Sequence, residues 1–355
     1  MQNIFGVVTV TTHGPYGFSY VAQEIAHVLN MPLMELSGKL GPLNYLKPLR
    51  VRPSFIISVG TIPPKKLMLF SVISKRVIAY VAVEGPFPIS KSILWLANNT
   101  NRLFIVTPSN YVKNELSSLG LKVKCVIPHG VDSNRIRREN NRLNLPLNKV
   151  KVLTVASSLQ YRKLLGLLYI LRAWSKLPWG VRKNGFLIFK LPKETGKSFK
   201  EIMDSLGFRN DEYMLLDSYF TRNEMFALYR AADLYVHPAL SDGFGLPIIE
   251  ALACGTPTIV LNAEPWNEIV TENVGWFVKV DKEIILHEDN LPYRLRIPNI
   301  HDFSKKIAEA ILCCKENREI LKKKCAEYAR IFDSRKVYGK FKELIKDLIS
   351  HKTQD

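Results

Sequence analysis

The stretch SDGFGLPIIEALACGTPTIV, residues 241–260, constrains the fold of this chain more than any other. Gly243 and Gly245 allow the backbone to bend and to approach a ligand closely. Pro247 fits the first position of a helix, and Gly255 ends that helix after roughly two turns. The N–H groups at a helix start, and the positive end of its dipole, stabilise an anion. The stretch therefore predicts a phosphate-binding loop that opens into a short helix and leads to a buried strand.

Two carboxylates flank this loop. Asp242 precedes the glycines, and Glu250 is expected in the first turn of the helix, on the side of the loop. Carboxylate oxygens accept hydrogen bonds from sugar hydroxyls, and a nucleotide sugar carries both hydroxyls and a diphosphate. The combination indicates a nucleotide-sugar site. In the alternative interpretation the two acids only cap the loop and the helix, but capping does not account for the glycines and the proline.

Asp242, seven further residues and then Glu250, with Gly-Phe-Gly-Leu-Pro between the acids, resemble the signature of glycosyltransferase family 4. This is the group 1 type that includes glycogen synthase and sucrose synthase. Segments 102–132 and 212–245 are also similar to that family. The resemblance implies an α/β fold of the GT-B type, in which two doubly wound Rossmann-like domains face each other across a cleft. It also implies transfer with retention of anomeric configuration.

The resemblance implies roles for single residues as well. The expected catalytic residues are Asp242, Glu250 and Glu84. The family signature usually begins with Glu where this chain has Asp242. Many members have a histidine near the end of the strand predicted at 77–85, where Glu84 is the polar residue of this chain.

Family members hold the donor diphosphate with an arginine that follows the first strand of the second domain and with a later lysine. This chain has Ala156 and Ser157 at the first place, so Arg162 and Lys163 are the expected phosphate ligands. The rest of the donor-binding set is Gly243, Phe244, Gly245 and Leu246. The expected acceptor side is the loop after the first strand, with His13, Gly14, Tyr16 and Gly17.

Length and hydrophobic periodicity predict two domains, because 355 residues exceed the usual span of about 100–200 residues for one. We expect an acceptor-side Rossmann-like domain at 1–132, a polar linker at 133–149 and a nucleotide-sugar-binding Rossmann-like domain at 150–331. Residues 303–350 are expected to be helical by period. The resemblance to GT-B enzymes implies that the last helix, within 332–355, packs back on the first domain. A basic amphipathic helix that lies on a membrane is the alternative for this last segment.

Positive charge is concentrated in the N-terminal part of the chain. The formal net charge is +18, and residues 1–150 contain 18 Lys and Arg against 6 Asp and Glu. Such a surface attracts polyanions or an anionic membrane, or simply stays solvated and steers an anionic donor. No apolar run reaches 18 residues, and no signal segment opens the chain. We expect a cytoplasmic protein with peripheral membrane contact through the basic N-terminal domain.

These patterns together predict a retaining glycosyltransferase of the hexosyltransferase type. It would move a sugar from a nucleotide-diphosphate sugar to a hydroxyl of a glycan, a lipid-linked acceptor or a protein glycan. Neither a cofactor nor a metal is expected, because the helix N-terminus and basic side chains would stabilise the leaving diphosphate. The alternative is a non-catalytic protein of the same fold that binds a polyanion, such as nucleic acid, or a membrane surface. Nucleic acid is not an expected partner of the enzyme.

Overall fold

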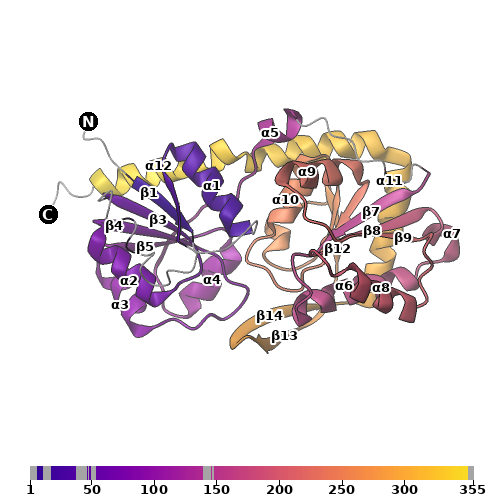
Figure 1. Cartoon of the computed structure of the whole chain (residues 1–355), viewed down its shortest axis with the longest axis horizontal. Helices are drawn as coiled ribbons and strands as arrows, with labels where there is room; N and C mark the ends of the chain where they lie inside the picture. The colour runs from indigo at the N-terminus through magenta and orange to yellow at the C-terminus, as the bar shows by residue number, and fades with distance from the viewer. Residues whose placement is uncertain are drawn as a thin grey trace. The chain divides into compact units, whose positions relative to one another are not determined.

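The computed structural model describes residues 6–10, 17–36, 46, 48, 53–138, 145 and 148–350. The chain divides into two compact units (Figure 1). Unit 1 consists of Met1–Asp132, Asp289–Pro292 and Ile331–Asp355, and unit 2 of Ser133–Glu288 and Tyr293–Arg330. Each unit contains one parallel six-stranded sheet, so the expected α/β class with two Rossmann-like sheets is confirmed.

Unit 1 has the strand order β2-β1-β3-β4-β5-β6. Its strands are short β-branched and aliphatic runs with both faces buried, as expected of a parallel sheet covered by helices. Helices α1 and α12 lie on one face, and α2 and α3 lie on the other (Figure 1). The strands are β1 (Gly6–Val10), β2 (Leu33–Glu35), β3 (Phe55–Gly60), β4 (Arg76–Val81), β5 (Leu103–Thr107) and β6 (Val123–Val126), and the helices are α1 (Gly17–Leu29), α2 (Pro64–Ile73), α3 (Lys91–Asn99), α4 (Asn110–Ser118) and α12 (Ser334–Ser350).

The last helix, α12, belongs to unit 1 and packs against α1. Its apolar side chains recur at helical spacing, and Val337, Phe341 and Leu344 are all buried. The Phe341 ring meets the Tyr80 ring of β4 edge-on, with 5.4 Å between the centroids. The apolar face of α12 is therefore covered by the protein itself.

Residues 127–131, which follow β6, form a surface against which the start of α12 packs, and we call this surface the α12 seat. The Gly130 N–H donates to the Tyr338 hydroxyl at 2.8 Å, and Val131 forms an isolated parallel bridge with Asp333. The Tyr80 hydroxyl donates to the Ile127 carbonyl at 2.6 Å and lies 2.9 Å from Nδ1 of His129. Since the single Tyr80 proton goes to the carbonyl, His129 donates to Tyr80 from Nδ1. His129 is thus a buried structural side chain in this seat.

Unit 2 has the strand order β12-β11-β10-β7-β8-β9. Its first strand, β7, is central: the chain adds β8 and β9 on one side and then returns to place β10 on the other. The strand order therefore reverses between β7 and β10. The elements are β7 (Val150–Val155), β8 (Gly185–Lys190), β9 (Tyr213–Leu216), β10 (Leu234–Val236), β11 (Thr258–Leu261) and β12 (Gly275–Val278), with α5 (Ser133–Arg138), α6 (Tyr161–Ser175), α7 (Trp179–Arg182), α8 (Gly196–Ser205), α9 (Arg222–Ala231), α10 (Leu246–Ala253), η2 (Trp266–Glu268), α11 (Ile300–Tyr328) and η3 (Ala329–Phe332).

A two-stranded hairpin interrupts unit 2 between β12 and α11. It consists of β13 (Val280–Glu288) and β14 (Leu291–Pro298). Its turn residues Asp289 and Asn290 have φ values of 52° and 60°, the left-handed conformation that two-residue hairpin turns require. The sequence analysis made no prediction for this hairpin.

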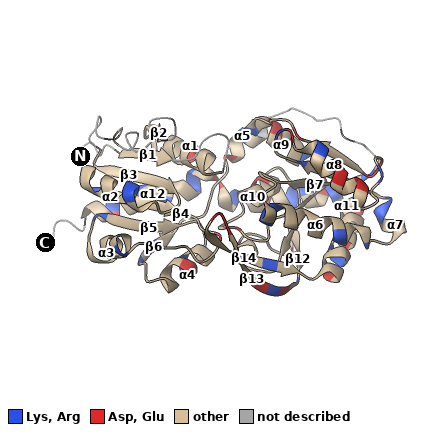
Figure 2. Ribbon diagram, turned by 60° about the horizontal axis from the view of Figure 1, so that its bottom comes forward, with Lys and Arg blue, Asp and Glu red and all other residues tan. Residues whose placement is uncertain are grey.

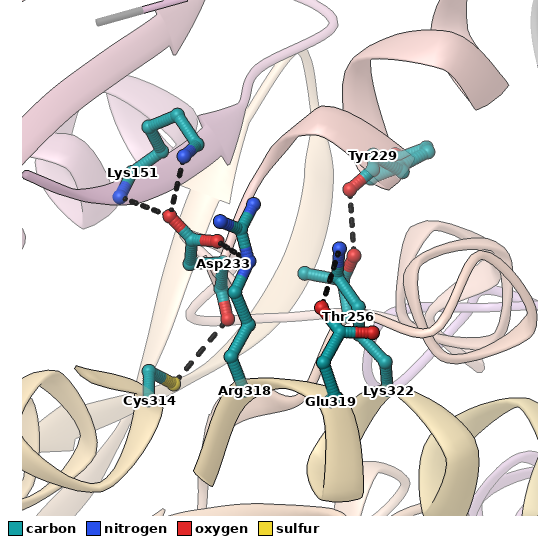
Figure 3. A network of polar contacts seen from close by, with 8 residues as sticks. All are labelled: Lys151, Tyr229, Asp233, Thr256, Cys314, Arg318, Glu319 and Lys322. Atoms are coloured by element: carbon teal, nitrogen blue, oxygen red, sulfur yellow. Dashed lines mark hydrogen bonds and ion pairs between the residues drawn. The ribbon is translucent and has the colours of Figure 1, made fainter. Parts of the chain in front are cut away.

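A network of buried ion pairs holds α11 against the amino-terminal edge of the unit 2 sheet, where β7 and β10 begin (Figure 3). Asp233, just before β10, accepts at 2.8 Å from Nζ of Lys151 and lies 2.6 Å from Nε of Arg318 on α11. The Cys314 thiol donates to the Asp233 carbonyl at 3.3 Å. Asp233 and Lys151 are both buried away from water, so each charge is compensated by the opposite charge of its partner.

Some boundaries differ from those expected. The strand predicted at 77–85 ends at Val81, and the described start of the expected linker, 133–138, is the helix α5 of unit 2. The helix predicted from residue 303 begins at Ile300. Asn299 explains this earlier start, because its side chain accepts from the Asp302 N–H and caps the helix.

Candidate active site

The candidate site lies at the carboxyl ends of β7 and β10, where the strand order of unit 2 reverses. Loops that diverge at such a point leave a crevice, which is where open α/β sheets bind ligands. The loop after β7 (156–160) leads into α6, and the loop after β10 (237–245) leads into α10. The starts of α6, α9 and α10 all face this edge, because each helix follows a strand.

Gly245 is the N-cap of α10 and forms the sharp turn that leads into this helix. It has φ 110° and ψ 53°, and a Cβ there would lie 2.7 Å from Cδ1 of Ile248. The positive φ therefore favours glycine, and any larger residue would also have to displace the end of the Ile248 side chain. The other predicted bending residue, Gly243, is not among the described residues with positive φ. Its N–H instead donates to Asp242 at 2.8 Å.

The helix α10 begins one residue earlier than expected, at Leu246. Pro247 is consequently its second residue, and Glu250 lies in its second turn, so the prediction that Glu250 lies in the first turn was wrong. The helix has about two turns, as predicted. In the described part of the chain, neither the N–H of Gly245 nor that of Leu246 donates to another residue. Both lie at the positive end of the helix dipole, so an anion would be stabilised there.

Asp242 is held by its own loop. Its Oδ1 accepts from the N–H groups of Gly243 at 2.8 Å and Phe244 at 3.3 Å, and its Oδ2 lies 3.4 Å from Nε2 of His237. Burial raises the pKa of Asp242, but the hydrogen bond from His237 and the positive charge of Lys163 outweigh it and lower that pKa to about 2. The side chain remains 24% exposed. Asp242 is therefore an ionised carboxylate with access to a ligand.

Glu250 is held by an arginine of the preceding helix. Its Oε1 lies 3.0 Å from Nη1 of Arg222, the first residue of α9, and only 11% of the Glu250 side chain is exposed. The Arg222 guanidinium lies over the Phe226 ring at 5.0 Å. This ion pair orients the Glu250 carboxylate at the edge of the crevice.

Tyr235 and His237 lie between the two acids. Burial, and then the negative charges of Asp242 and Glu250, raise the pKa of Tyr235 well above its ordinary value. The Tyr235 hydroxyl lies 3.1 Å from Nδ1 of His237. A Tyr235 hydroxyl that donates to Nδ1 leaves the proton of His237 on Nε2, facing Asp242. Tyr235 and His237 are then joined by a hydrogen bond, and Nε2 of His237 lies 3.4 Å from Oδ2 of Asp242.

The two cations expected to hold the diphosphate lie in different surroundings. Lys163 is near enough to Asp242 for its positive charge to lower the pKa of that carboxyl group. Arg162 is ion-paired with Glu288 of β13 at 2.5 Å and lies 3.9 Å over the ring of Tyr293 of β14. Arg162 therefore connects the start of α6 to the hairpin, and Lys163 is the better placed of the two to reach a phosphate beside Asp242.

Close packing fixes the position of the ligand loop. A Cβ at Gly166 of α6 would lie only 1.8 Å from the Pro238 carbonyl oxygen. On the other side of the loop, the Arg296 N–H of β14 donates to the Leu240 carbonyl at 2.8 Å. The loop that carries Asp242 is thus held between α6 and the hairpin.

The remaining predicted residues are placed as follows. Phe244 is buried, and its N–H contacts Asp242. Glu84 belongs to unit 1, three residues beyond the end of β4, and is half-buried. Gly17 is the exposed first residue of α1. His13, Gly14 and Tyr16 lie outside the described residues. Trp266, downstream of the loop, is fully buried in the core.

Sequence reasoning missed Arg222 and the hairpin residues Glu288, Tyr293 and Arg296. The signal for Arg222 was present, because the capping box of Thr221 and Glu224 marks the start of α9 and hence its place at this edge. For the hairpin the signal was weak, because Asp289 and Asn290 lie between two strands of mixed polar and apolar residues. Within the described ranges, no group of three or more His, Cys, Asp or Glu residues gathers in a way that could hold a metal ion.

The fold and this site define a class of protein, and comparison with known proteins agrees. Residues 135–289 match the family model described as glycosyl transferases group 1. The structure of Anabaena HepE in complex with UDP and glucose superposes with a TM-score of 0.68 at 17% identity, over 97% of this chain and 100% of that one. Residues 135–289 are therefore similar to group 1 glycosyltransferases, and the chain shares the GT-B fold of the superposed structure.

Relatives in sequence match over shorter stretches. The putative glycosyltransferase 41 of Sulfolobus islandicus filamentous virus is 31% identical over 151 residues, which are 42% of this chain and 44% of that protein. The mannosyltransferase WbdA of Escherichia coli is 28% identical over 109 residues, 30% of this chain and 13% of that protein. The matched part thus spans less than half of either relative.

Proposed function

We propose that this protein is a retaining, hexosyltransferase-type glycosyltransferase that uses a nucleotide-diphosphate sugar. The observation that carries the proposal is the pairing of two oriented carboxylates, Asp242 and Glu250, with an anion-binding helix start at one switch point. The diphosphate fits the N–H groups of Gly245 and Leu246 and the ammonium of Lys163. The carboxylates fit the hydroxyls of the donor, with Glu250 in the arrangement expected for a ribose contact.

In the proposed reaction the bond between the anomeric carbon and the leaving phosphate oxygen breaks, and the acceptor hydroxyl oxygen bonds to that carbon on the same face. The hydroxyl proton passes to the leaving phosphate oxygen. The protein contributes mainly by stabilising the charge that develops on the diphosphate. No protein-bound metal or cofactor takes part. We assign the acceptor, a glycan or a lipid-linked sugar, to unit 1, with Glu84 as a candidate contact.

The experiment is calorimetric titration of the protein against nucleoside diphosphates and their sugars, each with and without Mg²⁺ and with a chelator. UDP is the first ligand to test, because HepE was crystallised with it. We expect one diphosphate to bind equally well with the chelator. Glu250→Gln still accepts from Arg222, so the fold is retained, but the affinity and the transfer rate should fall about tenfold or more.

The matched control is Glu272→Gln, an exposed acid of the same unit, which should behave like the unchanged protein. A Glu250→Gln variant with full affinity and full transfer activity would contradict the proposed site. Failure of every diphosphate to bind would favour the alternative of a polyanion-binding protein with this fold.

A further inference from the structure

Unit 1 contains a pocket that is not part of the candidate active site of unit 2. It has a volume of about 1010 Å³ and is formed at the amino-terminal edge of the unit 1 sheet, where β4, β5 and β6 begin. The ends of α2 and α3 and Leu348 of α12 complete it. Donor and acceptor loops of such folds leave the sheet at the carboxyl edge. The proposed reaction therefore has no use for this pocket.

The pocket is basic. Four of its eleven lining residues are cationic and none is acidic: Lys75, Arg76, Arg102 and Lys124. Arg102 donates to the Ser71 carbonyl at 2.9 Å, which holds its guanidinium in place without neutralising it. Lys124 has a single acidic contact, Asp347, at 3.4 Å, and both side chains are well exposed. An exposed pair of this kind contributes little, so the pocket keeps its positive potential.

Apolar side chains are exposed on the two helices, α2 and α3, that end at this pocket. Val72 lines it and is 78% exposed, and Met68, one turn earlier on α2, is 46% exposed. Trp95 of the neighbouring helix α3 is 62% exposed. Exposed apolar groups of this size beside cations match the two layers of a membrane interface, where basic groups meet phosphates and aliphatic or indole groups enter the acyl boundary.

From this juxtaposition we propose that the α2–α3 surface of unit 1 and its basic pocket bind the headgroups of an anionic phospholipid bilayer. Figure 2 shows the charged residues along these elements. Single-stranded nucleic acid is the less suitable polyanion, because it stacks successive bases on aromatic faces. Trp95 is exposed on this surface, but Phe104 in the pocket is half-buried, and the other exposed apolar groups, Val72 and Met68, are not aromatic. In the described part of the chain, none of the helices is both long and apolar enough to cross a bilayer. The contact would be peripheral.

This inference deepens the proposed function by assigning a surface to the membrane contact, but it does not depend on donor binding. The pocket residues belong to unit 1 and the donor loops to unit 2, so replacing the pocket residues should leave nucleotide binding unchanged. Failure of one proposal can therefore be told from failure of the other.

The test is co-sedimentation of the full chain with vesicles of phosphatidylcholine alone and with phosphatidylglycerol added. We expect binding only to the anionic vesicles and weaker binding at higher salt. Lys75→Glu and Val72→Asp both change exposed side chains and should each weaken binding about tenfold or more, since each basic group near such a surface contributes substantially. Lys113→Glu, on exposed α4 of the same unit, is the charge-matched control and should bind within about twofold of the unchanged protein.

Three results would overturn the inference. One is absence of binding to anionic vesicles. Another is equal binding by all three variants, which would move the contact to a different surface. The third is binding of a fluorescent single-stranded oligonucleotide that is lost in Lys75→Glu without any vesicle binding, which would make this a nucleic-acid surface. Titration of the variants with the nucleoside diphosphate that binds the unchanged protein reports on the donor site separately.

Discussion

A single buried lysine makes unit 1 sensitive to pH. Lys66 of α2 is only 1% exposed, and its ammonium lies 5.5 Å from the centre of the Phe70 ring. Burial lowers the pKa of Lys66 from 10.5 to about 7. Below that pH the lysine is charged in both the folded and the unfolded chain, so folding buries a charge. Between about 7 and 10.5 only the unfolded chain stays charged, so stability rises with pH.

We therefore predict that Lys66→Met stabilises the protein at and below neutral pH. The gain should reach a few kcal/mol at most, since one pKa unit corresponds to about 1.4 kcal/mol, and it should vanish as the pH approaches the ordinary pKa of lysine. Urea denaturation at several pH values measures it. Lys65→Met, the exposed neighbour, is the control. A gain that is the same at every pH would show that Lys66 is not buried as a titrating group.

Residue patterns predicted the local chemistry of the site and missed its partners. The spacing of Asp242 and Glu250 located both acids, and the glycine-proline pattern located α10, because these features depend on neighbours in the sequence. The pairing of Glu250 with Arg222, and of Arg162 with Glu288, depends on which strands lie side by side. No local sequence pattern encodes which strands are neighbours. The sequence therefore did not reveal that Arg162 pairs with the hairpin while Lys163 lies near the ligand loop.

At the scale of elements, the approach of α6 to the ligand loop should control donor binding. Gly166→Ala would place a methyl group 1.8 Å from the Pro238 oxygen, so either α6 or the loop must move. We expect a loss of about 1–3 kcal/mol in unfolding free energy, and donor affinity should fall because Asp242 moves with the loop. Thermal melting and calorimetry measure the two effects.

Gly180 of α7 provides the matched control, because a Cβ there meets nothing within 4 Å. Gly180→Ala should be neutral or stabilise by about 0.5–1 kcal/mol, with unchanged donor affinity. Unchanged affinity in Gly166→Ala would mean that the loop position does not depend on α6.

Elements were predicted better than their connections. Ser109 and Thr221 start α4 and α9 as expected, since each accepts from an N–H three residues on. The hairpin β13–β14 was missed, although it holds Arg162 and the carbonyl of Leu240. Its strands carry a mixed polar pattern because they are half-exposed, and such segments give a weak periodic signal.

At the scale of the molecule, the division into two units predicts that a donor affects only one of them. Hydrogen exchange with a saturating nucleoside diphosphate should show added protection in unit 2, at 156–166 and 237–250. Exchange in the α12 seat around Tyr80 and Tyr338 should stay unchanged, because a ligand stabilises the structure that binds it. Added protection confined to unit 1 would contradict a nucleotide site in unit 2.

The return of α12 to unit 1 also sets the order in which the chain folds during synthesis. When the ribosome has added Arg330, every residue assigned to unit 2 exists, whereas the seat around Tyr80 and Gly130 still lacks Tyr338 and Phe341. Domains fold as units once their residues are available. The second half of this chain therefore completes its fold first, and the nascent first half keeps an uncovered apolar surface, of the kind that chaperones bind, until α12 has left the exit tunnel.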